Sequence, residues 1–173
     1  MEISIVPIGT GKEFLAIDSR QLLHHINALV TEHSLIITDR KYSIAGEAKW
    51  KKESADEIDH GRKLIIAAFV GGKLAGLCEA RRGRGKERFN LFFGMSVAEK
   101  YRHHGIGDEM LSLAIYEGKR RFDSKNIYIT YHGDNKVARK MYESFGFEEI
   151  ARLPKYMFHY GEFVDRVIMQ LKR

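Results

Sequence analysis

Apolar and polar positions follow two different periods along this chain, and each change of period marks a new element. The opening stretch 3–9 is typical of a short strand. Residues 11–33 then carry apolar side chains whose later members have helical spacing, which predicts a helix. The strongly charged stretch 43–61 predicts another helix, and Gly61 is a suitable residue to end it. The first third of the chain is therefore expected to form one strand and two helices.

The middle of the chain predicts three antiparallel strands. Stretches 63–70 and 73–80 are separated by Gly71 and Gly72, and a two-glycine link favours a tight hairpin because such turns need a positive φ. The stretch 89–97 alternates, with Asn90, Gly94 and Ser96 on one face and Phe92 as an exception. The other face is apolar and consists of Phe89, Leu91, Phe93, Met95 and Val97. This alternation is typical of a half-buried strand with a partly small second face.

The pattern becomes helical again at Gly107. The apolar stripe of this helix consists of Met110, Leu111, Ala114, Ile115, Gly118 and Phe122, and Glu117 is among the polar residues placed mostly off it. A strand is predicted over 126–131. The next helix should start after Asp134 or Asn135 and end at Gly146, with an apolar face made of Val137, Ala138, Met141, Tyr142 and Phe145. Two strands, 147–158 and 162–171, complete a mixed α+β fold, which we expect to be a single domain over residues 1–173.

Composition narrows the class of protein. With 44% hydrophobic residues the chain can fill a core, and its one cysteine, Cys78, excludes a disulfide framework. We see no signal peptide and no apolar run long enough to span a membrane, so a cytoplasmic protein is expected. The formal charge of +6 suits either a nucleic acid or an anionic small molecule as partner.

A glycine-containing turn at 102–108 is the best candidate for binding an anion. The stretch 9–12 is no Walker loop, because Val6 and Glu13 stand where that motif needs glycine and a hydroxyl residue. The dinucleotide motif GxGxxG also fails, since the third glycine position holds Phe14, Arg88 or Met110 in the three candidate segments. The turn leads into a helix, whose first N–H groups lack internal partners. Arg102, with His103 and His104, adds positive potential that suits a pyrophosphate. The alternative is that Gly105 and Gly107 only permit a tight bend.

Two segments in register resemble a known family. The sequence "VAEKYRHHGIGDEML" resembles the acetyl-CoA signature of the GCN5-related N-acetyltransferases, with Arg102, Gly105 and Gly107 at the matching positions. About thirty residues later, "NKVARKMYESFGF" resembles the second element of the family; the matching residues are Asn135, Ala138, Met141, Tyr142, Gly146 and Phe147. The tail "HYGEFVDRVIMQ" resembles the closing hairpin of the branch with ribosomal-protein and polyamine acetyltransferases. The resemblance covers nearly the whole chain.

This resemblance implies a fold and a cosubstrate. The fold would be a central, mostly antiparallel sheet of six to seven strands, flanked by about four helices and splayed between the fourth and fifth strands. Acetyl-CoA would lie in the splay. The implied contacts are Met95, Ser96 and Val97 for the pantetheine arm, the turn Arg102, His103, His104, Gly105, Ile106, Gly107 and Asp108 for the pyrophosphate, and Asn135, Arg139 and Tyr142 farther along the chain. Asp108 would have to point outward, as a helix cap, to avoid repelling the phosphates.

The resemblance also implies the chemistry. The protein would transfer the acetyl group to a primary amine by direct attack through a tetrahedral intermediate, with Tyr142 as the general acid for the leaving thiolate. A phenol suits this role because it keeps its proton at neutral pH. The oxyanion would be stabilised by a backbone N–H near Val97. For the general base the sequence offers Glu79, Glu32 and His132, and water is another route; we take Glu79 as the candidate.

Several alternatives stay open. The same fold could bind CoA without turnover, or the basic segment 81–88 could bind nucleic acid, although it lacks the interleaved aromatic residues that favour single strands. No Cys or His cluster has metal-binding spacing, so we predict no metal. Trp50 could line the acceptor site, although packing in the core is the simpler role. The sequence leaves the acceptor amine open, and an edge strand near the C-terminus could pair two subunits into a homodimer.

Overall fold

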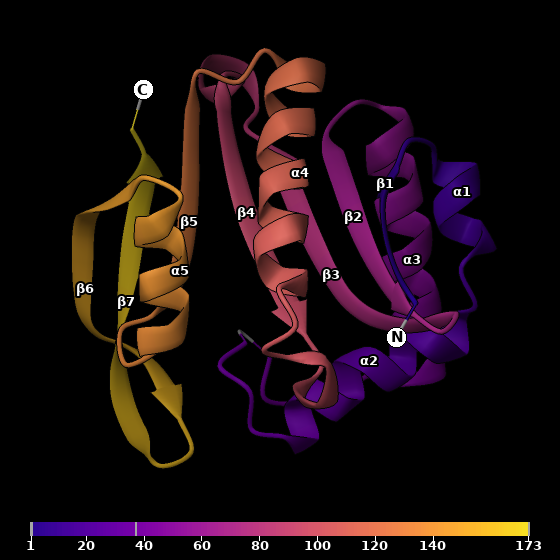
Figure 1. Cartoon of the computed structure of the whole chain (residues 1–173), viewed down its shortest axis with the longest axis horizontal. Coiled ribbons are helices and arrows are strands. Elements are labelled where there is room, and N and C mark those ends of the chain that lie inside the picture. Colours follow the sequence, from indigo (N-terminus) through magenta and orange to yellow (C-terminus); the bar gives the residue numbers. More distant parts are fainter. Residues whose placement is uncertain (1, 37, 173) are drawn as a thin grey trace.

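The computed structural model describes residues 2–36 and 38–172, and the strands of these residues form one seven-stranded sheet (Figure 1). The sheet has the order β1-β2-β3-β4-β5-β7-β6, in which only β4 and β5 run parallel. The strands are β1 (Ile3–Ile8), β2 (Lys63–Val70), β3 (Lys73–Arg82), β4 (Asn90–Val97), β5 (Asn126–His132), β6 (Phe147–His159) and β7 (Glu162–Leu171). The expected mixed fold with a mostly antiparallel sheet is confirmed.

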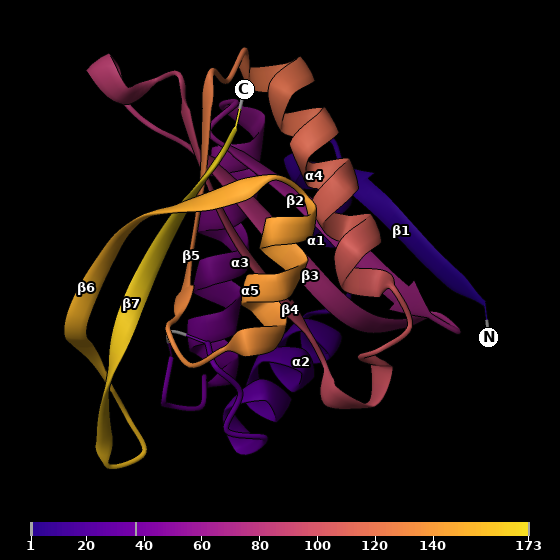
Figure 2. The same ribbon diagram turned by 60° about the vertical axis from the view of Figure 1, so that its left-hand side comes forward.

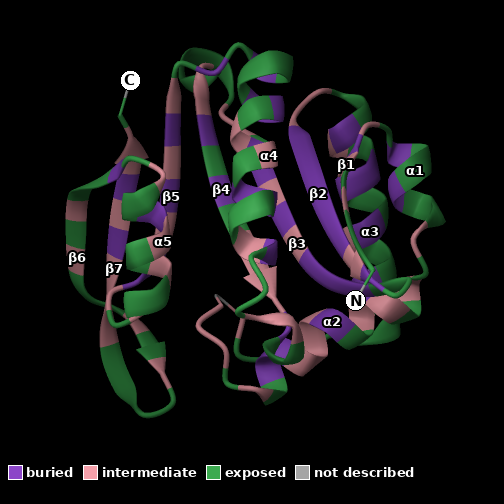
Figure 3. Cartoon of the chain, in the orientation of Figure 1, coloured by how far each residue is buried: buried purple, intermediate pink, exposed green. Residues whose placement is uncertain are grey.

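Within the described residues, five α-helices cover the two faces of the sheet. They are α1 (Gly11–Ala16), α2 (Ser19–Thr31), α3 (Ile44–Asp59), α4 (Ile106–Phe122) and α5 (Lys136–Ser144). Helices α4 and α5 lie on one face, and α1, α2 and α3 lie on the other (Figures 1 and 2). Strand β2 is buried on both faces, because Leu64 and Ile66 pack toward α4 while Ile65 and Ala67 pack toward the N-terminal helices (Figure 3).

The segment 11–33 forms two helices where one was expected. The break falls at Ile17 and Asp18, where the Asp18 side chain accepts the N–H of Arg20 and caps α2. The ammonium of Lys51 binds the carbonyls of Leu15 and Ile17 at the same place. A side-chain cap and a buried cation satisfy the backbone groups that the break leaves unpaired.

The predicted hairpin and helix end are confirmed. Gly71 and Gly72 connect β2 to β3 with φ of +53° and +74°. Gly61 follows α3 with φ of +64°, and its N–H bonds the carbonyl of Ile58. Glycine adopts such positive φ values without the steric cost that a Cβ would add.

Two expectations about helix faces are wrong. Val137 of α5 is 70% exposed, although it was placed on the apolar face. Glu117 of α4 was placed mostly off the buried stripe, yet it is only 7% exposed. Its carboxylate lies 2.6 Å from the guanidinium of Arg120 and 2.7 Å from that of Arg121. These two side chains cover the carboxylate, which explains how a charged group can be buried there.

Strands β4 and β5 separate halfway along their length. Their register pairs Asn90–Phe93 only with Asn126–Ile129. Beyond this point β4 continues to Val97 with pairing to β3 alone, while the last residues of β5 pair with β7. The free backbone edge from Gly94 to Val97 therefore faces a gap between two strand ends. The expected splay is confirmed.

No helix in the described part of the chain is long and apolar enough to cross a membrane. Within the same residues, no group of three or more His, Cys, Asp or Glu side chains lies together as a metal site would require.

Candidate active site

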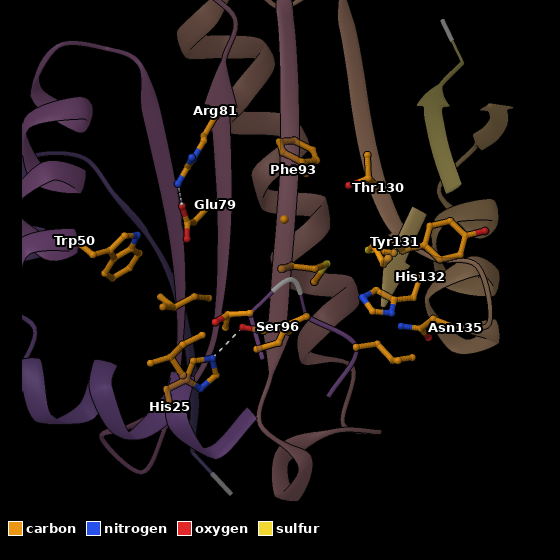
Figure 4. Close-up of a pocket in the computed structure, with 18 of the residues that line it drawn as sticks. His25, Trp50, Glu79, Arg81, Phe93, Ser96, Thr130, Tyr131, His132 and Asn135 are labelled. Carbon is orange, nitrogen blue, oxygen red and sulfur yellow. Dashed lines mark hydrogen bonds and ion pairs between the residues drawn. The ribbon is translucent and has the colours of Figure 1, made fainter. Parts of the chain in front are cut away.

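A cavity of about 440 Å³ opens where β4 and β5 separate. Its walls come from α2 and α3 on one side, from β3 and β4 along the floor, and from β5, α5 and β7 on the other side (Figure 4). The polar and aromatic residues on these walls are His25, Thr38, Tyr42, Glu47, Trp50, Glu79, Arg81, Phe93, Ser96, Thr130, Tyr131, His132, Asn135, Tyr142 and Arg166. Trp50 both lines the cavity and packs edge-on against Phe14, with ring centroids 5.6 Å apart.

The free edge of β4 forms the floor of the cavity. Gly94, Met95 and Ser96 line it, whereas Val97 does not. A Cβ placed on Gly94 would have no neighbouring atom within 4 Å, so this glycine leaves open space above the strand. The structure thus brings together two of the three residues expected to meet the pantetheine arm.

The predicted general acid lies on the cavity wall. Tyr142 is 5% exposed, and burial raises the pKa of its phenol. The ring of Tyr131 packs edge-on against it at 5.6 Å between centroids. The hydroxyl of Tyr131 is buried without a hydrogen-bond partner among the described residues, and burial raises its pKa as well. Both phenols therefore keep their protons at neutral pH.

A histidine to which the sequence analysis assigned no role in the site reaches the free edge of β4. His25 of α2 is buried, and its Nε2 lies 2.9 Å from Oγ of Ser96. Burial lowers the pKa of His25 to about 4. The imidazole is therefore neutral at physiological pH, and it joins α2 to the strand that forms the floor of the cavity.

Two carboxylates line the cavity, and they differ in their partners. Glu79, the predicted base, lies 3.3 Å from the ammonium of Lys63 and 3.2 Å from the guanidinium of Arg81. Glu47 of α3 is 3% exposed, and its Oε1 has no hydrogen-bond partner among the described residues. Burial raises the pKa of Glu47 to about 7.

Glu47 was missed by the sequence analysis, although one signal was present. It precedes Lys51, Ser54, Ala55 and Ile58 by four, seven, eight and eleven positions, and all of these are buried residues of α3. That spacing is the core-facing stripe of a helix. A carboxylate at the start of such a stripe indicates a buried acid.

The other two candidate bases have different positions. Glu32 does not line the cavity; it accepts from the backbone N–H of Glu99 and pairs with Arg102. His132 is buried on the cavity wall, and burial lowers its pKa. Of the three predicted bases, the cavity therefore contains Glu79 and His132.

Arg102 does not present a free positive charge to the turn. Its Nε donates to the carbonyl of Val97 at 2.9 Å, and its Nη2 donates to Glu32 at 2.9 Å and to Ser34 at 2.8 Å. The guanidinium thus fastens the turn to the end of β4 and to the end of α2. Glu32 thus balances part of the positive potential that Arg102 was expected to add to the turn.

The turn 103–108 has the backbone shape of an anion site. His103 and Gly105 adopt left-handed conformations with φ of +64° and +76°, and Nδ1 of His104 donates to the carbonyl of Arg102 at 2.7 Å. Alternating backbone conformations of this kind turn successive N–H groups toward one point. A Cβ on Gly105 would have no atom within 4 Å, so the approach is open. These features fit a diphosphate at the start of α4.

The other predicted cofactor residues are distributed as follows. The side chain of Ile106 is buried in the core, which leaves its backbone N–H as its only polar contribution. Asp108 is exposed, and no capping hydrogen bond from its side chain is found among the described residues, so the expected helix cap is not seen. Asn135 lines the cavity and also caps α5, since its Oδ1 accepts the N–H of Ala138 at 3.0 Å. Arg139 lies outside the cavity and pairs with Glu143 at 2.8 Å.

Comparisons with known proteins agree with this geometry. A family model described as "Acetyltransferase (GNAT) family" matches residues 30–147. The L-amino acid N-acetyltransferase AaaT of Escherichia coli (strain K12) is 26% identical over 120 residues, which cover 69% of this chain and 73% of that protein.

Solved structures share the fold over nearly the whole chain. An N-acetyltransferase from Staphylococcus aureus Mu50 superposes with a TM-score of 0.84 at 16% identity, covering 99% of both chains. A phosphinothricin acetyltransferase from Sinorhizobium meliloti, in complex with acetyl-CoA, gives 0.81 at 17% identity over 98% of this chain and 88% of that one. A ribosomal-protein-alanine N-acetyltransferase from Brucella melitensis gives 0.78 at 20% identity over 98% of both chains.

Proposed function

The chain belongs to the GNAT family of acetyltransferases, and on that premise we propose that it acetylates the primary amine of a small molecule held in the cavity between α3 and β7. As a member of this family it is an acetyl-CoA-dependent N-acetyltransferase. The observation that carries the proposal is the position of the cavity. It opens at the separation of β4 and β5, and Tyr142 lies on its wall.

The charges on the cavity walls suit an acceptor that carries both an amine and a carboxylate. Glu47 of α3 supplies an unpaired acid on one side. Arg166 of β7 supplies a cation on the other; it donates to Thr130 at 2.9 Å and has no carboxylate partner among the described residues. The similarity to an L-amino acid N-acetyltransferase supports the same class of acceptor.

We propose three roles for residues of this chain toward acetyl-CoA, which supplies an acetyl thioester open to attack by an amine. The backbone N–H groups at the start of α4 bind the diphosphate. The edge of β4 from Met95 to Val97, which pairs with no strand on the side of β5, bonds the pantetheine arm. An N–H near Val97 stabilises the oxyanion. Tyr142 gives its proton to the departing sulfur.

A panel of acceptors tests the proposal. The protein would be incubated with acetyl-CoA and with L-amino acids, polyamines, lysine peptides or peptides with an N-terminal alanine, and the released thiol would be measured. We expect turnover with one or more free amino acids and little with peptides, because the cavity is small. Turnover confined to peptides would contradict the small acceptor, and no thiol release with any amine would contradict the proposed reaction.

A further inference from the structure

We propose that Glu47 receives the proton of the acceptor ammonium and so makes the nitrogen able to attack. This inference rests on the proposed function, because it concerns the acceptor in the same cavity. An amine in water is mostly protonated at neutral pH, and an ammonium has no electron pair for attack. The site therefore needs a group that takes one proton before the N–C bond forms.

The partners of the two cavity carboxylates decide which one can take that proton. Protonation of Glu79 would cost its ion pairs with Lys63 and with Arg81. Glu47 has no ion pair, and one of its oxygens is buried without a hydrogen-bond partner in the described chain. A buried carboxylate without a partner is stabilised by an ammonium placed beside it, and it is also stabilised when it takes up a proton. The geometry thus separates a fixed anion, Glu79, from a proton acceptor, Glu47.

The charged surroundings of Glu47 lead to the same conclusion. Burial raises its pKa to about 7, while Lys51 lowers it and Glu79 raises it. Lys51 lies one turn along α3, but its ammonium is bound to Leu15, Ile17 and Ser19 and forms no ion pair with Glu47. The other titratable or charged groups on the elements around Glu47 are His25 on α2, Lys63 on β2 and Arg81 on β3. Helix α1 contacts α3 at Trp50 and at Asp59.

The proton balance of the step closes with residues of the cavity. The ammonium gives one proton to Glu47, and the freed electron pair of nitrogen attacks the carbonyl carbon of the thioester. The C–S bond breaks, its electron pair stays on sulfur, and sulfur takes a proton from Tyr142. The tyrosine recovers its proton from the second N–H of the nitrogen through water, and Glu47 returns its own to solvent. The products are the N-acetyl amine, the free thiol and one released proton.

The first test is the pH dependence of kcat/KM in the parent and in two matched variants, E47Q and E79Q. Below about pH 7 the carboxyl of Glu47 holds a proton and cannot accept another. The parent should therefore lose activity as pH falls through 7. In E47Q the inflection near pH 7 should disappear. The nitrogen can then react only as the neutral amine, so kcat/KM should rise with pH toward the pKa of the acceptor and be lowered about 100-fold at pH 8. E79Q should keep the inflection of kcat/KM near pH 7, even where its kcat/KM is lower than that of the parent. An inflection near pH 7 that persists in E47Q and disappears in E79Q would overturn the proposal.

A second test uses an acceptor that needs no base. Hydroxylamine is already neutral at pH 7, so its nitrogen can attack without giving up a proton first. We expect E47Q and the parent to acetylate hydroxylamine at rates within a few-fold of each other, while their rates with an ordinary amine differ about 100-fold. Equal losses with both acceptors would show that Glu47 only shapes the cavity, and would overturn the proposed proton transfer.

A third measurement needs no turnover and separates this inference from the proposed function. The ¹³C resonance of the Glu47 carboxyl, assigned by comparison with E47Q, would be followed against pH in the intact protein. A midpoint near 7 is expected. A midpoint near the ordinary value for glutamate would overturn the proposal even if no acceptor had been found. If the parent released no thiol with any amine, the proposed function would fail, and this titration would still decide whether Glu47 can take up a proton near neutral pH.

Discussion

The guanidinium of Arg102 lies 2.9 Å from the carboxylate of Glu32, and this ion pair ties the glycine turn to the end of α2. The same guanidinium donates to the carbonyl of Val97, the last residue of β4. One side chain therefore holds together the strand edge, the turn before α4 and the helix that carries His25. From these contacts we predict that Arg102 positions the turn.

Substitution of Arg102 should weaken acetyl-CoA binding through the shape of the turn. We expect R102M to raise the Kd for acetyl-CoA by about 10- to 100-fold, since a charged hydrogen bond is worth about 1.5–3 kcal/mol. E32Q should also raise Kd, by less, because it loosens the same attachment. Calorimetric titration of both variants and of the double variant would measure the coupling. Tighter binding in E32Q would instead indicate that Arg102, once released, contacts the phosphates directly.

Removal of one hydroxyl should separate catalysis from binding. We expect Y142F to lower kcat by about 100-fold or more, because a general acid contributes about 10²–10⁴ to the rate. The Kd for acetyl-CoA should change less than about threefold, equivalent to about 0.7 kcal/mol. Y131F removes the hydroxyl of the neighbouring ring and is the matched control, which should retain most of the turnover. Equal rates in Y142F and the parent would exclude Tyr142 as the acid.

Side chains added at Gly94 should block the acceptor without unfolding the protein. A Cβ at this position has open space around it, and the backbone there needs no positive φ. We expect kcat/KM for the amine to fall stepwise from Gly94→Ala to Gly94→Leu, while Tm stays within about 4 °C, a change of about 1 kcal/mol or less. Gly76 in β3 offers a contrast. A Cβ there would lie 2.8 Å from the carbonyl oxygen of Ser96, so Gly76→Ala should lower Tm. Full activity in Gly94→Leu would show that the acceptor binds elsewhere.

The buried imidazole of His25 should make the folded state sensitive to acid. Its pKa is lowered to about 4 from an unfolded value near 6.5. Because the pKa is lower in the folded protein, its contribution to stability is complete above the pKa of the unfolded state. The contribution is lost as pH falls from there to the pKa of the folded state. The parent should therefore lose up to about 3 kcal/mol between pH 7 and pH 4, since each pKa unit corresponds to about 1.4 kcal/mol.

Urea unfolding at several pH values checks this expectation. Between pH 7 and pH 4, the free energy of unfolding of H25Q should change less than that of the parent. The difference should be most of the about 3 kcal/mol attributed to His25. H24Q changes the neighbouring histidine, which is exposed, and should leave the dependence as it is in the parent. The same slope in H25Q and the parent would assign the acid sensitivity to other groups.

Local sequence patterns determined the elements of this protein. The two-glycine hairpin, the strand alternation of 89–97 and the turn before α4 depend on neighbours along the chain, and the structure has all three where the patterns predicted them. The break at Asp18 was not predicted. The cap that Asp18 provides is local, but the break is also stabilised by Lys51, which lies more than thirty residues away in the sequence. The splay between β4 and β5 came from the family resemblance and is confirmed by the register of the two strands.

Tertiary structure alone decided the charge state and the partners of the candidate catalytic groups. The sequence indicated Glu79 as the candidate base and did not indicate Glu47. In the described structure Lys63 and Arg81 pair with Glu79, whereas Oε1 of Glu47 has no hydrogen-bond partner. Arg102 and Glu32 are seventy residues apart, and no local pattern joins them. A periodicity reports which face of an element is apolar, because that depends on neighbours within one or two turns. An ion pair or a raised pKa depends on groups that folding brings together from distant segments, so it could be found only in the folded chain.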